Sequence, residues 1–477
     1  MNKKIIHNFL YQVIYQMSTI LFPIITIPIV SKALGSEGLG TYNYIGSIVS
    51  YFVMLAGLGL SNYGIREIAS VRENNEQRNK RFWELEILNF ILTLITLVTF
   101  VLVSFMVDKQ KLYLLSGISI LAVLFDITWF FYGIEDFKKI SIINFLIKAL
   151  TCLLISIYIH TNDDLYLYII IQSGGTLLAN LSMWIFIPKK VNFVKIAFSD
   201  VIRHVKPAAR FFVGKVSVVL YTTVNKSLLG ILGTFTLVGL YTNSMLLISI
   251  GVTMISVLDN VLMPHMTKLY VSNKKEKMKD VLHKTIQIQL FFSVLFFFGI
   301  ILTTPKLVPW LFGSEFSYTK IIIPFLSIIV IVQPLGFSIS RQFLIPMNKI
   351  KEYNMSVMYA GILGVLLNLV LIPLIGIWGA VVASILSESL VTIYRILELK
   401  REMNYSLDYI YMLKLFLLGI IMLLLTEHLT MGMSETMSTS FTQAIIGTGI
   451  YFVGSILCKV NPIKTSKFKL IKYKKNE

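Results

Sequence analysis

The sequence predicts an all-α, polytopic membrane protein with about 14 transmembrane helices. Of its 477 residues, 56% are hydrophobic and only 14% are charged, and the mean hydropathy is +0.75. Apolar segments recur along the whole chain, each close to the roughly 20 residues that a helix needs to cross a bilayer. The segments between them are too short to form a soluble domain, so we expect the chain to lie almost entirely in the membrane.

The predicted spans follow one another from the N-terminus. The chain begins with Lys3 and Lys4, as a signal peptide would, but the apolar stretch that follows is too long and lacks a small-residue cleavage site. We therefore expect a retained first helix. The spans are predicted near residues 10–33, 41–61, 83–107, 112–133, 140–160, 165–187, 208–232, 238–262, 284–304, 319–340, 353–374, 377–397, 409–427 and 441–459.

Basic residues are distributed unevenly between the two sides of these spans. With the N-terminus inside, 34 of the 43 Lys and Arg residues fall in inner segments, five in outer segments and four within spans. Cytoplasmic segments of membrane proteins carry such an excess, so both termini are predicted to be cytoplasmic. The net charge of +18 is then explained without nucleic acid as a partner. We expect the basic segments to face the anionic lipids of the inner leaflet.

The remaining composition excludes several function classes. The two cysteines, Cys152 and Cys458, form no CxxC motif, and the six histidines form no HExxH motif or metal-ligand cluster. The sequence has no P-loop either. We therefore expect neither an enzyme nor an ATP-driven pump, and we predict no metal and no cofactor.

A short repeat suggests that the chain has two related halves. The first predicted span is followed by LGSEGLGTYN, and the seventh is followed by LGTFTLVGLYTN. Both stretches place a glycine two residues before a tyrosine, Gly40 before Tyr42 and Gly239 before Tyr241. A match this short also arises by chance, so the repeat and the chance match are both open.

The basic linker at residues 188–210 divides the first twelve spans into six and six. Together with the repeat, it predicts two six-helix bundles, residues 1–205 and 206–400. Residues 401–477 are predicted to form two additional transmembrane helices and a basic cytoplasmic tail.

Two lysines lie inside one predicted helix, in the stretch VGKVSVVLYTTVNKSLLG. Lys215 and Lys226 are separated by about 1100° around an α-helix, within about 20° of three full turns. Both ammonium groups are therefore expected on one face, roughly 16 Å apart along the axis. A charge at the bilayer centre costs about 2.5–3.5 kcal/mol, which favours a functional role. The alternative is that both lysines snorkel to the membrane interfaces.

Acidic residues inside the spans are candidates for ion coupling. Asp126 and Lys148 lie about eight residues to either side of the turn GIEDFKK, so an antiparallel hairpin would place them at similar depth. A structural ion pair between them and an ion-coupling role for Asp126 are both open. Glu388, inside the span at 377–397, is the second candidate for ion coupling.

The chain resembles the Wzx-type polysaccharide flippases of the multidrug/oligosaccharidyl-lipid/polysaccharide exporter superfamily. The resemblance covers most of residues 20–395. In the first half, the matching stretches are ITIPIVSKALGSEGLGTYNYIGSI, GLGLSNYGIREIASVR and LFDITWFFYGIEDFKKI. In the second half, they are KVSVVLYTTVNKSLLGILGTFTLVGLYTNSMLL, VLMPHMTKLY, WLFGSEF and LIPLIGIWGAVVASILSES.

This resemblance implies a V-shaped arrangement of the two bundles, like that of the multidrug and toxin extrusion (MATE) transporters. It also implies a flippase that moves an undecaprenyl-diphosphate-linked oligosaccharide from the inner to the outer leaflet by alternating access. The product would be a surface polysaccharide of a bacterial cell, such as capsule or O-antigen. Polysaccharide assembly proteins would be further partners.

Under this reading, cationic side chains in the cavity would bind the diphosphate. We predict Lys215 and Lys226 for this role, with Arg66, Arg210 and Arg341 near the cytoplasmic span ends. The alternative for the arginines is that they follow the positive-inside rule alone. Polar residues would hydrogen-bond sugars, and the candidates are Asn225, Asn243, Gln333 and Asn368.

Two other functions remain open. A multidrug or metabolite cation antiporter of the same superfamily would be expected to place acids in its cavity, but the first span contains no Asp or Glu. A membrane-embedded polysaccharide polymerase would be expected to have a long external loop, which is absent from the predicted topology. The flippase is the preferred function.

Overall fold

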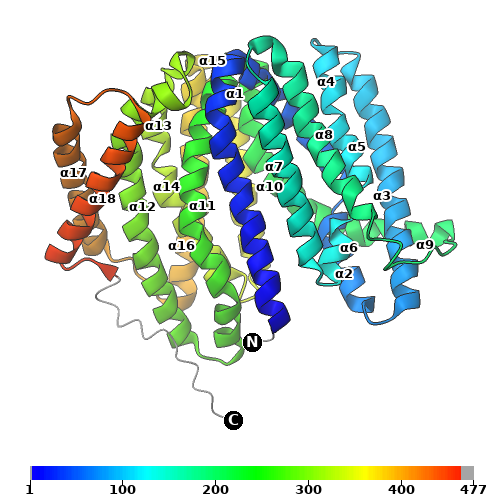
Figure 1. The fold of residues 1–477 in the computed structure, drawn as a ribbon. Helices are drawn as coiled ribbons and strands as arrows, with labels where there is room; N and C mark the ends of the chain where they lie inside the picture. The colour runs from blue at the N-terminus through cyan, green and yellow to red at the C-terminus, as the bar shows by residue number, and fades with distance from the viewer. Residues whose placement is uncertain (1–2, 463–477) are drawn as a thin grey trace. The chain divides into compact units, whose positions relative to one another are not determined.

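The computed structural model of the chain describes residues 3–462, apart from the side chains at positions 3–17, 20, 213–215, 217, 218, 220 and 221. The described residues form helices joined by short turns, with no β-strand among them (Figure 1). The predicted all-α fold is confirmed.

The chain divides into two compact units, Met1–Gly239 and Leu240–Glu477. The helices of the first unit are α1 (Lys3–Gly57), α2 (Leu60–Val71), α3 (Asn75–Ser104), α4 (Gln110–Ser116), α5 (Ile118–Leu124), α6 (Thr128–Gly133), α7 (Phe137–Tyr158), η1 (Asn162–Asp164), α8 (Leu165–Trp184), α9 (Phe198–Ile202) and α10 (Val205–Leu232). The helix α11 (Phe235–Val271) begins in this unit and continues into the second.

The second unit continues with α12 (Lys275–Leu311), η2 (Ser314–Phe316), α13 (Thr319–Leu326), α14 (Ile329–Ile339), η3 (Ser340–Leu344), α15 (Ile350–Ile375), α16 (Ile377–Met403), α17 (Tyr409–Thr430) and α18 (Met437–Leu457). The division between these units falls between Gly239 and Leu240, inside α11. The bundle boundaries predicted from the sequence stay predictions. Within the first unit, α10 packs closely on the start of α2, where a Cβ at Gly59 would lie 2.7 Å from Ala208 O.

Twelve helices in the described part of the chain are long and apolar enough to cross a membrane. The first of them, Leu21–Val71, contains a kink at Gly35, which separates the first two predicted spans. Gly35 has a φ of 63°, a left-handed conformation that glycine adopts without a steric cost. The predicted span at 208–232 corresponds to α10. Each of the predicted spans thus coincides with helical structure, although the span at 112–133 is divided into α4, α5 and α6 and the span at 319–340 into α13 and α14.

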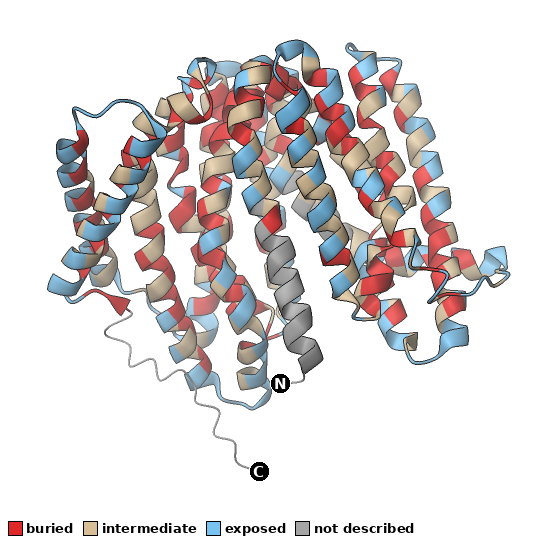
Figure 2. Ribbon diagram, viewed as in Figure 1, coloured by how far each residue is buried: buried red, intermediate tan, exposed pale blue. Residues whose placement is uncertain are grey.

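Exposed positions recur along the length of these helices (Figure 2), and many of them are large apolar residues. On α17, for example, Leu413, Leu417 and Leu424 are each more than half exposed. Contiguous apolar surface of this kind would be unstable in water, but it is the normal surface of a helix that faces lipid. The protein is therefore a multi-pass membrane protein.

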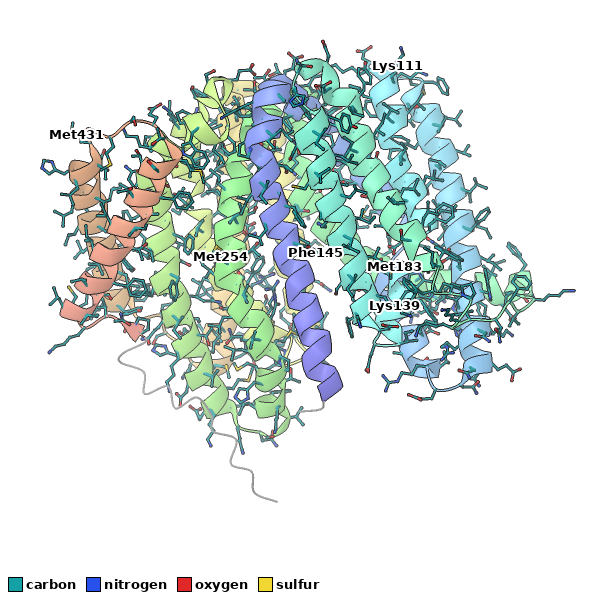
Figure 3. The ribbon with its side chains drawn as sticks, in the orientation of Figure 1. Lys111, Lys139, Phe145, Met183, Met254 and Met431 are labelled. Carbon is teal, nitrogen blue, oxygen red and sulfur yellow. The ribbon has the colours of Figure 1, made fainter. Side chains whose placement is uncertain are left out.

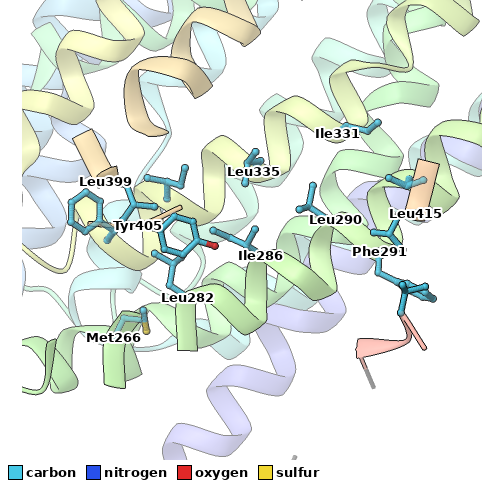
Figure 4. Packing of buried hydrophobic residues seen from close by; sticks show 14 of the residues in the cluster. Met266, Leu282, Ile286, Leu290, Phe291, Ile331, Leu335, Leu399, Tyr405 and Leu415 are labelled. Atoms are coloured by element: carbon cyan, nitrogen blue, oxygen red, sulfur yellow. The ribbon is translucent and has the colours of Figure 1, made fainter. Parts of the chain in front are cut away.

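Each unit has its own apolar core. In the first unit, aromatic rings of α3 and α6 pack together, and Phe82 stacks on Trp129 with ring centroids 5.6 Å apart. In the second unit, α12 contributes Ile286, Leu290 and Phe291 to a core that also includes Leu415 of α17 (Figure 4). The C-terminal helices α17 and α18 therefore belong to the second unit.

Candidate functional site

The helix α10 contacts α1 through buried hydroxyl groups. Ser227 is buried, and its hydroxyl donates to Ser47 Oγ at 2.8 Å and lies 2.9 Å from Tyr51 OH. At Gly230, a Cβ would lie only 2.1 Å from the ring of Tyr44. These contacts fix how α10 is rotated against α1.

Lys226 lies next to this contact, about 100° around the helix from Ser227. Its side chain is partly buried, and no charged side chain among the described residues pairs with its ammonium group. Asn225 is also partly buried, and it has an interaction partner. Lys215 belongs to α10 as well, but its side chain lies outside the described residues. A common face for Lys215 and Lys226 therefore stays a prediction.

The three arginines predicted near the span ends differ in their surroundings. Arg66 on α2 and Arg210 on α10 are exposed. Arg341 is partly buried in the π-helical turn η3, with its guanidinium carbon 4.8 Å from the centre of the Phe337 ring. Stacking of this kind is a cation–π contact, which orients the guanidinium. A substrate contact by any of the three stays a prediction.

The predicted span that includes Asp126 is broken in the structure. This segment, α4–α6, runs from the end of the first unit where Lys111 lies to the opposite end, where Lys139 lies (Figure 3). Helix α5 ends at Leu124, and α6 begins at Thr128. The Asp126 carboxylate caps α6, because its Oδ1 accepts from the Thr128 amide at 3.0 Å and from the Thr128 hydroxyl at 2.6 Å.

Side chains from neighbouring helices donate hydrogen bonds to backbone carbonyls at this break. Asn180 Nδ2 donates to Ala122 O at 2.7 Å, and Trp184 Nε1 donates to Phe125 O at 3.1 Å. Asn89 Nδ2 donates to Val123 O at 2.8 Å. The carbonyls of Ala122 and Val123 also accept from the backbone amides of Phe125 and Asp126, so Asn180 and Asn89 add second hydrogen bonds there. Trp184 provides a partner for the Phe125 carbonyl, which would be costly to leave unpaired at membrane depth.

Glu86 lies near the break and was not predicted as a site residue. It is 6% exposed, and its Oε2 has no hydrogen-bond partner among the described residues. Asp126 is close enough to interact with it electrostatically. The sequence contained a signal for it, because an acid inside a predicted span is a functional candidate by default.

The predicted ion pair between Asp126 and Lys148 is wrong. No salt bridge joins these two described residues, and the Asp126 carboxylate caps α6 instead. The turn between α6 and α7 contains only residues 134–136. Lys148 lies twelve residues beyond this turn and Asp126 eight before it, so their depths differ by about 6 Å at 1.5 Å per residue.

The second unit contains two acids with polar partners. Glu388 on α16 is partly buried, and its Oε1 accepts from Gln333 Nε2 of α14 at 2.8 Å. Asp259 on α11 is fully buried and was not predicted. Its Oδ1 accepts from Gln289 Nε2, Ser338 Oγ and Gln342 Nε2 at 2.9, 2.8 and 2.7 Å. Asp259 therefore joins α11 to α12, α14 and η3.

A buried carboxylate also organises the end of the first unit where α3 begins. Glu84 is fully buried, with Oε1 2.7 Å from Arg203 Nη2 and Oε2 3.0 Å from His204 Nε2. Tyr63 OH lies 2.7 Å from His204 Nδ1, which fits a neutral imidazole that donates from Nε2. Burial lowers the pKa of His204, against the opposing effect of its hydrogen bond to Glu84. This cluster ties the basic linker to α3 and is structural.

The repeated glycines of the sequence meet in the structure. A Cβ at Gly40 would lie 1.6 Å from Phe235 O and 2.9 Å from the Gly239 nitrogen. A Cβ at Gly239 would lie 2.0 Å from Ser36 O. The two glycines therefore allow α1 and the start of α11 to cross with their backbones in contact.

This helical arrangement is shared with solved membrane transporters. The structure "Lipid II flippase MurJ, inward closed conformation" matches with a TM-score of 0.75 at 16% identity, over 94% of this chain and 99% of that chain. "Crystal structure of MATE in the bent conformation" matches with a TM-score of 0.55 at 14% identity, over 84% and 95%. At such identities, the likeness establishes the fold, which is a MATE-like transporter fold.

The sequence comparison identifies the family. The family described as "Polysaccharide biosynthesis protein" matches residues 5–270, and the chain belongs to it. A protein of Escherichia coli (strain K12) named "Putative O-antigen transporter" is 22% identical over 398 residues, which cover 81% of this chain and 94% of that protein. A protein of Shigella dysenteriae with the same name is 21% identical over 387 residues, covering 80% and 96%. The resemblance to Wzx-type flippases is confirmed.

Proposed function

We propose that this protein moves an undecaprenyl-diphosphate-linked oligosaccharide from the inner to the outer leaflet by alternating access. Two findings support a lipid-linked sugar as the substrate class: the relatives named as O-antigen transporters and the fold shared with a lipid II flippase. The observation within the molecule that supports it most is Lys226, a partly buried cation in a membrane-length helix without an anionic partner among the described residues.

A diphosphate headgroup must be neutralised while it leaves water. The ammonium group of a lysine binds phosphate through charge and without a fixed bidentate geometry, which suits a ligand that moves on. Because no anionic side chain among the described residues pairs with it, Lys226 is available for the headgroup. Lys215, Arg66, Arg210, Arg341 and Asn225 are proposed as further substrate contacts.

The proposed location is the bacterial cell membrane, with both termini in the cytoplasm. This orientation rests on the excess of Lys and Arg in the predicted inner segments. It places the basic loops against the anionic inner leaflet, from which the glycolipid would be transported. Polysaccharide assembly proteins are proposed to receive it on the other side.

Asp126 and Glu388 are proposed to couple transport to an ion gradient. Asp126 lies at a break in a membrane-length helix, and broken helices of this kind coordinate coupling ions in other transporters. Glu86, with one carboxylate oxygen unpaired among the described residues, is the natural proton acceptor beside it.

A cation antiporter is the second candidate function, because the MATE transporters share this fold. The carboxylates Glu86 and Asp259 inside membrane-length helices are the observation that favours it, since acids at membrane depth suit cationic substrates. The unpaired Lys226 disfavours it. Drug susceptibility of a deletion strain separates the two, because only loss of an antiporter should sensitise cells to cationic drugs.

Deletion of the gene tests the flippase directly. Lipid-linked oligosaccharide should accumulate in the inner leaflet, and surface polysaccharide should disappear. Normal surface polysaccharide in the deletion strain would overturn the proposal.

Variants of Lys226 test its role in the rescued strain. Lys226→Arg should retain much of the transport, Lys226→Ala should reduce it, and Lys226→Glu should abolish it, because a carboxylate repels the headgroup. Lys414→Ala is the matched control, since Lys414 also lies in a membrane-length helix but is exposed. Normal transport by Lys226→Glu at normal protein abundance would exclude Lys226 from the phosphate path.

A further inference from the structure

The first unit contains a cavity of about 280 Å³ between α1, α4, α5 and α8. Its lining is polar without being charged: none of the described residues around it is Asp, Glu, Lys, Arg or His. The polar side chains of the lining, apart from Tyr42, are Ser50, Ser116, Ser119, Gln172, Ser173 and Thr176.

These hydroxyl groups present mainly acceptors to the cavity. Ser50, Ser116, Ser173 and Thr176 each donate their hydroxyl hydrogen to a carbonyl of their own helix, at 2.6–3.1 Å. Their oxygen lone pairs remain available. Ser119 makes no hydrogen bond to a described residue, so its hydroxyl can donate or accept. The cavity therefore suits a neutral ligand that offers several hydrogen-bond donors.

One wall of the cavity is aromatic. Tyr42 lines it, and the ring of Tyr168 packs edge-on against Tyr42 with centroids 4.7 Å apart and planes at 65°. Gln172 Nε2 donates to Tyr168 OH at 3.2 Å, which holds the pair in place. The ligand thus meets an ordered aromatic ring together with a group of hydroxyl acceptors.

A pyranose ring has the matching chemistry. Its hydroxyls donate hydrogen bonds around its edge, and its C–H groups form apolar faces that can pack on an aromatic ring. The cavity has space for about nine waters of liquid volume and lies near the lower limit of ligand pockets, so it fits about one ring. A diphosphate would need cations, and a metal ion would need carboxylates, neither of which lines the cavity.

We propose that this cavity binds one sugar ring of the transported glycolipid. The inference rests on the proposed flippase function and adds to it a site in the first unit that recognises the glycan. The headgroup and the glycan would then be bound by different residues, Lys226 for the first and the hydroxyl-lined cavity for the second.

Gly46 offers a way to fill the cavity without disturbing the helix. It lines the cavity, and a Cβ there would meet no atom within 4 Å. Gly174 on α8 is the matched control, because its Cβ position is equally open but it does not line the cavity. The variants are Gly46→Leu and Gly174→Leu in the full-length protein.

Binding is measured by calorimetry on purified protein with two probes, undecaprenyl diphosphate and the glycolipid that accumulates in the deletion strain. The wild type should bind the glycolipid more tightly. Gly46→Leu should weaken glycolipid binding at least tenfold, down to the affinity for undecaprenyl diphosphate. Its affinity for undecaprenyl diphosphate should stay within twofold of the wild-type value. Gly174→Leu should bind both lipids as the wild type does. The double variant Ser119→Ala/Ser173→Ala, which removes hydroxyls without adding bulk, should weaken only glycolipid binding, several-fold.

If Gly46→Leu binds the glycolipid as tightly as the wild type does, the inference is overturned, because the cavity then holds water and no sugar ring. Equal binding of the two probes by the wild type would overturn it too. Failure of the proposed function would look different, because the wild type would then bind neither lipid. If Gly46→Leu does not fold, the serine double variant decides on its own.

Discussion

Gly40 on α1 lies against the start of α11, and replacing it with alanine should force the two helices apart. The new Cβ would lie 1.6 Å from Phe235 O, whereas real Cβ contacts stay beyond 3.0 Å. The crossing must therefore open by about 1.4 Å. Because the opposing atom is a backbone carbonyl, no side-chain rotation can relieve the clash. We expect a cost near the upper end of the ~1–3 kcal/mol typical of overpacking.

Gly46→Ala is the matched control for this prediction. It lies on the same helix, and its Cβ would meet nothing within 4 Å. Both substitutions gain about the same helix propensity, ~1 kcal/mol relative to glycine, so their difference isolates the clash. Melting temperature and SDS-induced unfolding of the purified protein should both rank Gly40→Ala as less stable.

The double variant Gly40→Ala/Gly239→Ala sharpens the test. Both glycines serve one crossing, so once the first alanine has opened it, the second should cost less than it does alone. Additive costs would show two independent sites. If Gly40→Ala and Gly46→Ala have the same melting temperature, the close approach of α1 and α11 is refuted.

At the other sites, the expected effects are on pH dependence, stability and coupling. Because burial lowers the pKa of His204, the folded protein binds fewer protons than the unfolded chain, whose histidine titrates near pH 6.5. The melting temperature should fall as the pH drops below about 6.5, and an unchanged slope in His204→Phe would contradict this assignment. Asp259→Leu leaves the amide groups of Gln289 and Gln342 without an acceptor, at about 1–3 kcal/mol each, while Ser338 can still donate to Gln289 Oε1; Asp259→Asn keeps the Oδ1 acceptor. Asp259→Leu should therefore melt well below Asp259→Asn, and equal melting temperatures would disprove the network. Glu86→Gln should keep normal abundance and lose the dependence of transport on a proton gradient, measured in proteoliposomes, and retained dependence would remove Glu86 from coupling.

The number and position of the spans could be predicted from the sequence. Whether a segment crosses a bilayer depends on its length and apolar content, which are properties of a linear stretch of chain. The segments at 83–107 and 353–374, for example, coincide with α3 and α15. The family could also be recognised from stretches of the sequence such as LGSEGLGTYN and LGTFTLVGLYTN. Gly40 and Gly239 stand out as a repeat in the sequence, whereas their contact is visible only in the structure.

The depth and partners of polar side chains were decided only by the tertiary structure. Asp126 was expected beside Lys148, but the break between α5 and α6 and the short turn before α7 put them at different depths. Asp259 gave a sequence signal as an acid in an apolar segment, yet its donors come from three other elements. Each residue along a helix changes depth by 1.5 Å and direction by 100°. Where a helix breaks and how it is rotated against its neighbours therefore decide which polar groups meet, and both are set by packing between segments far apart in the chain.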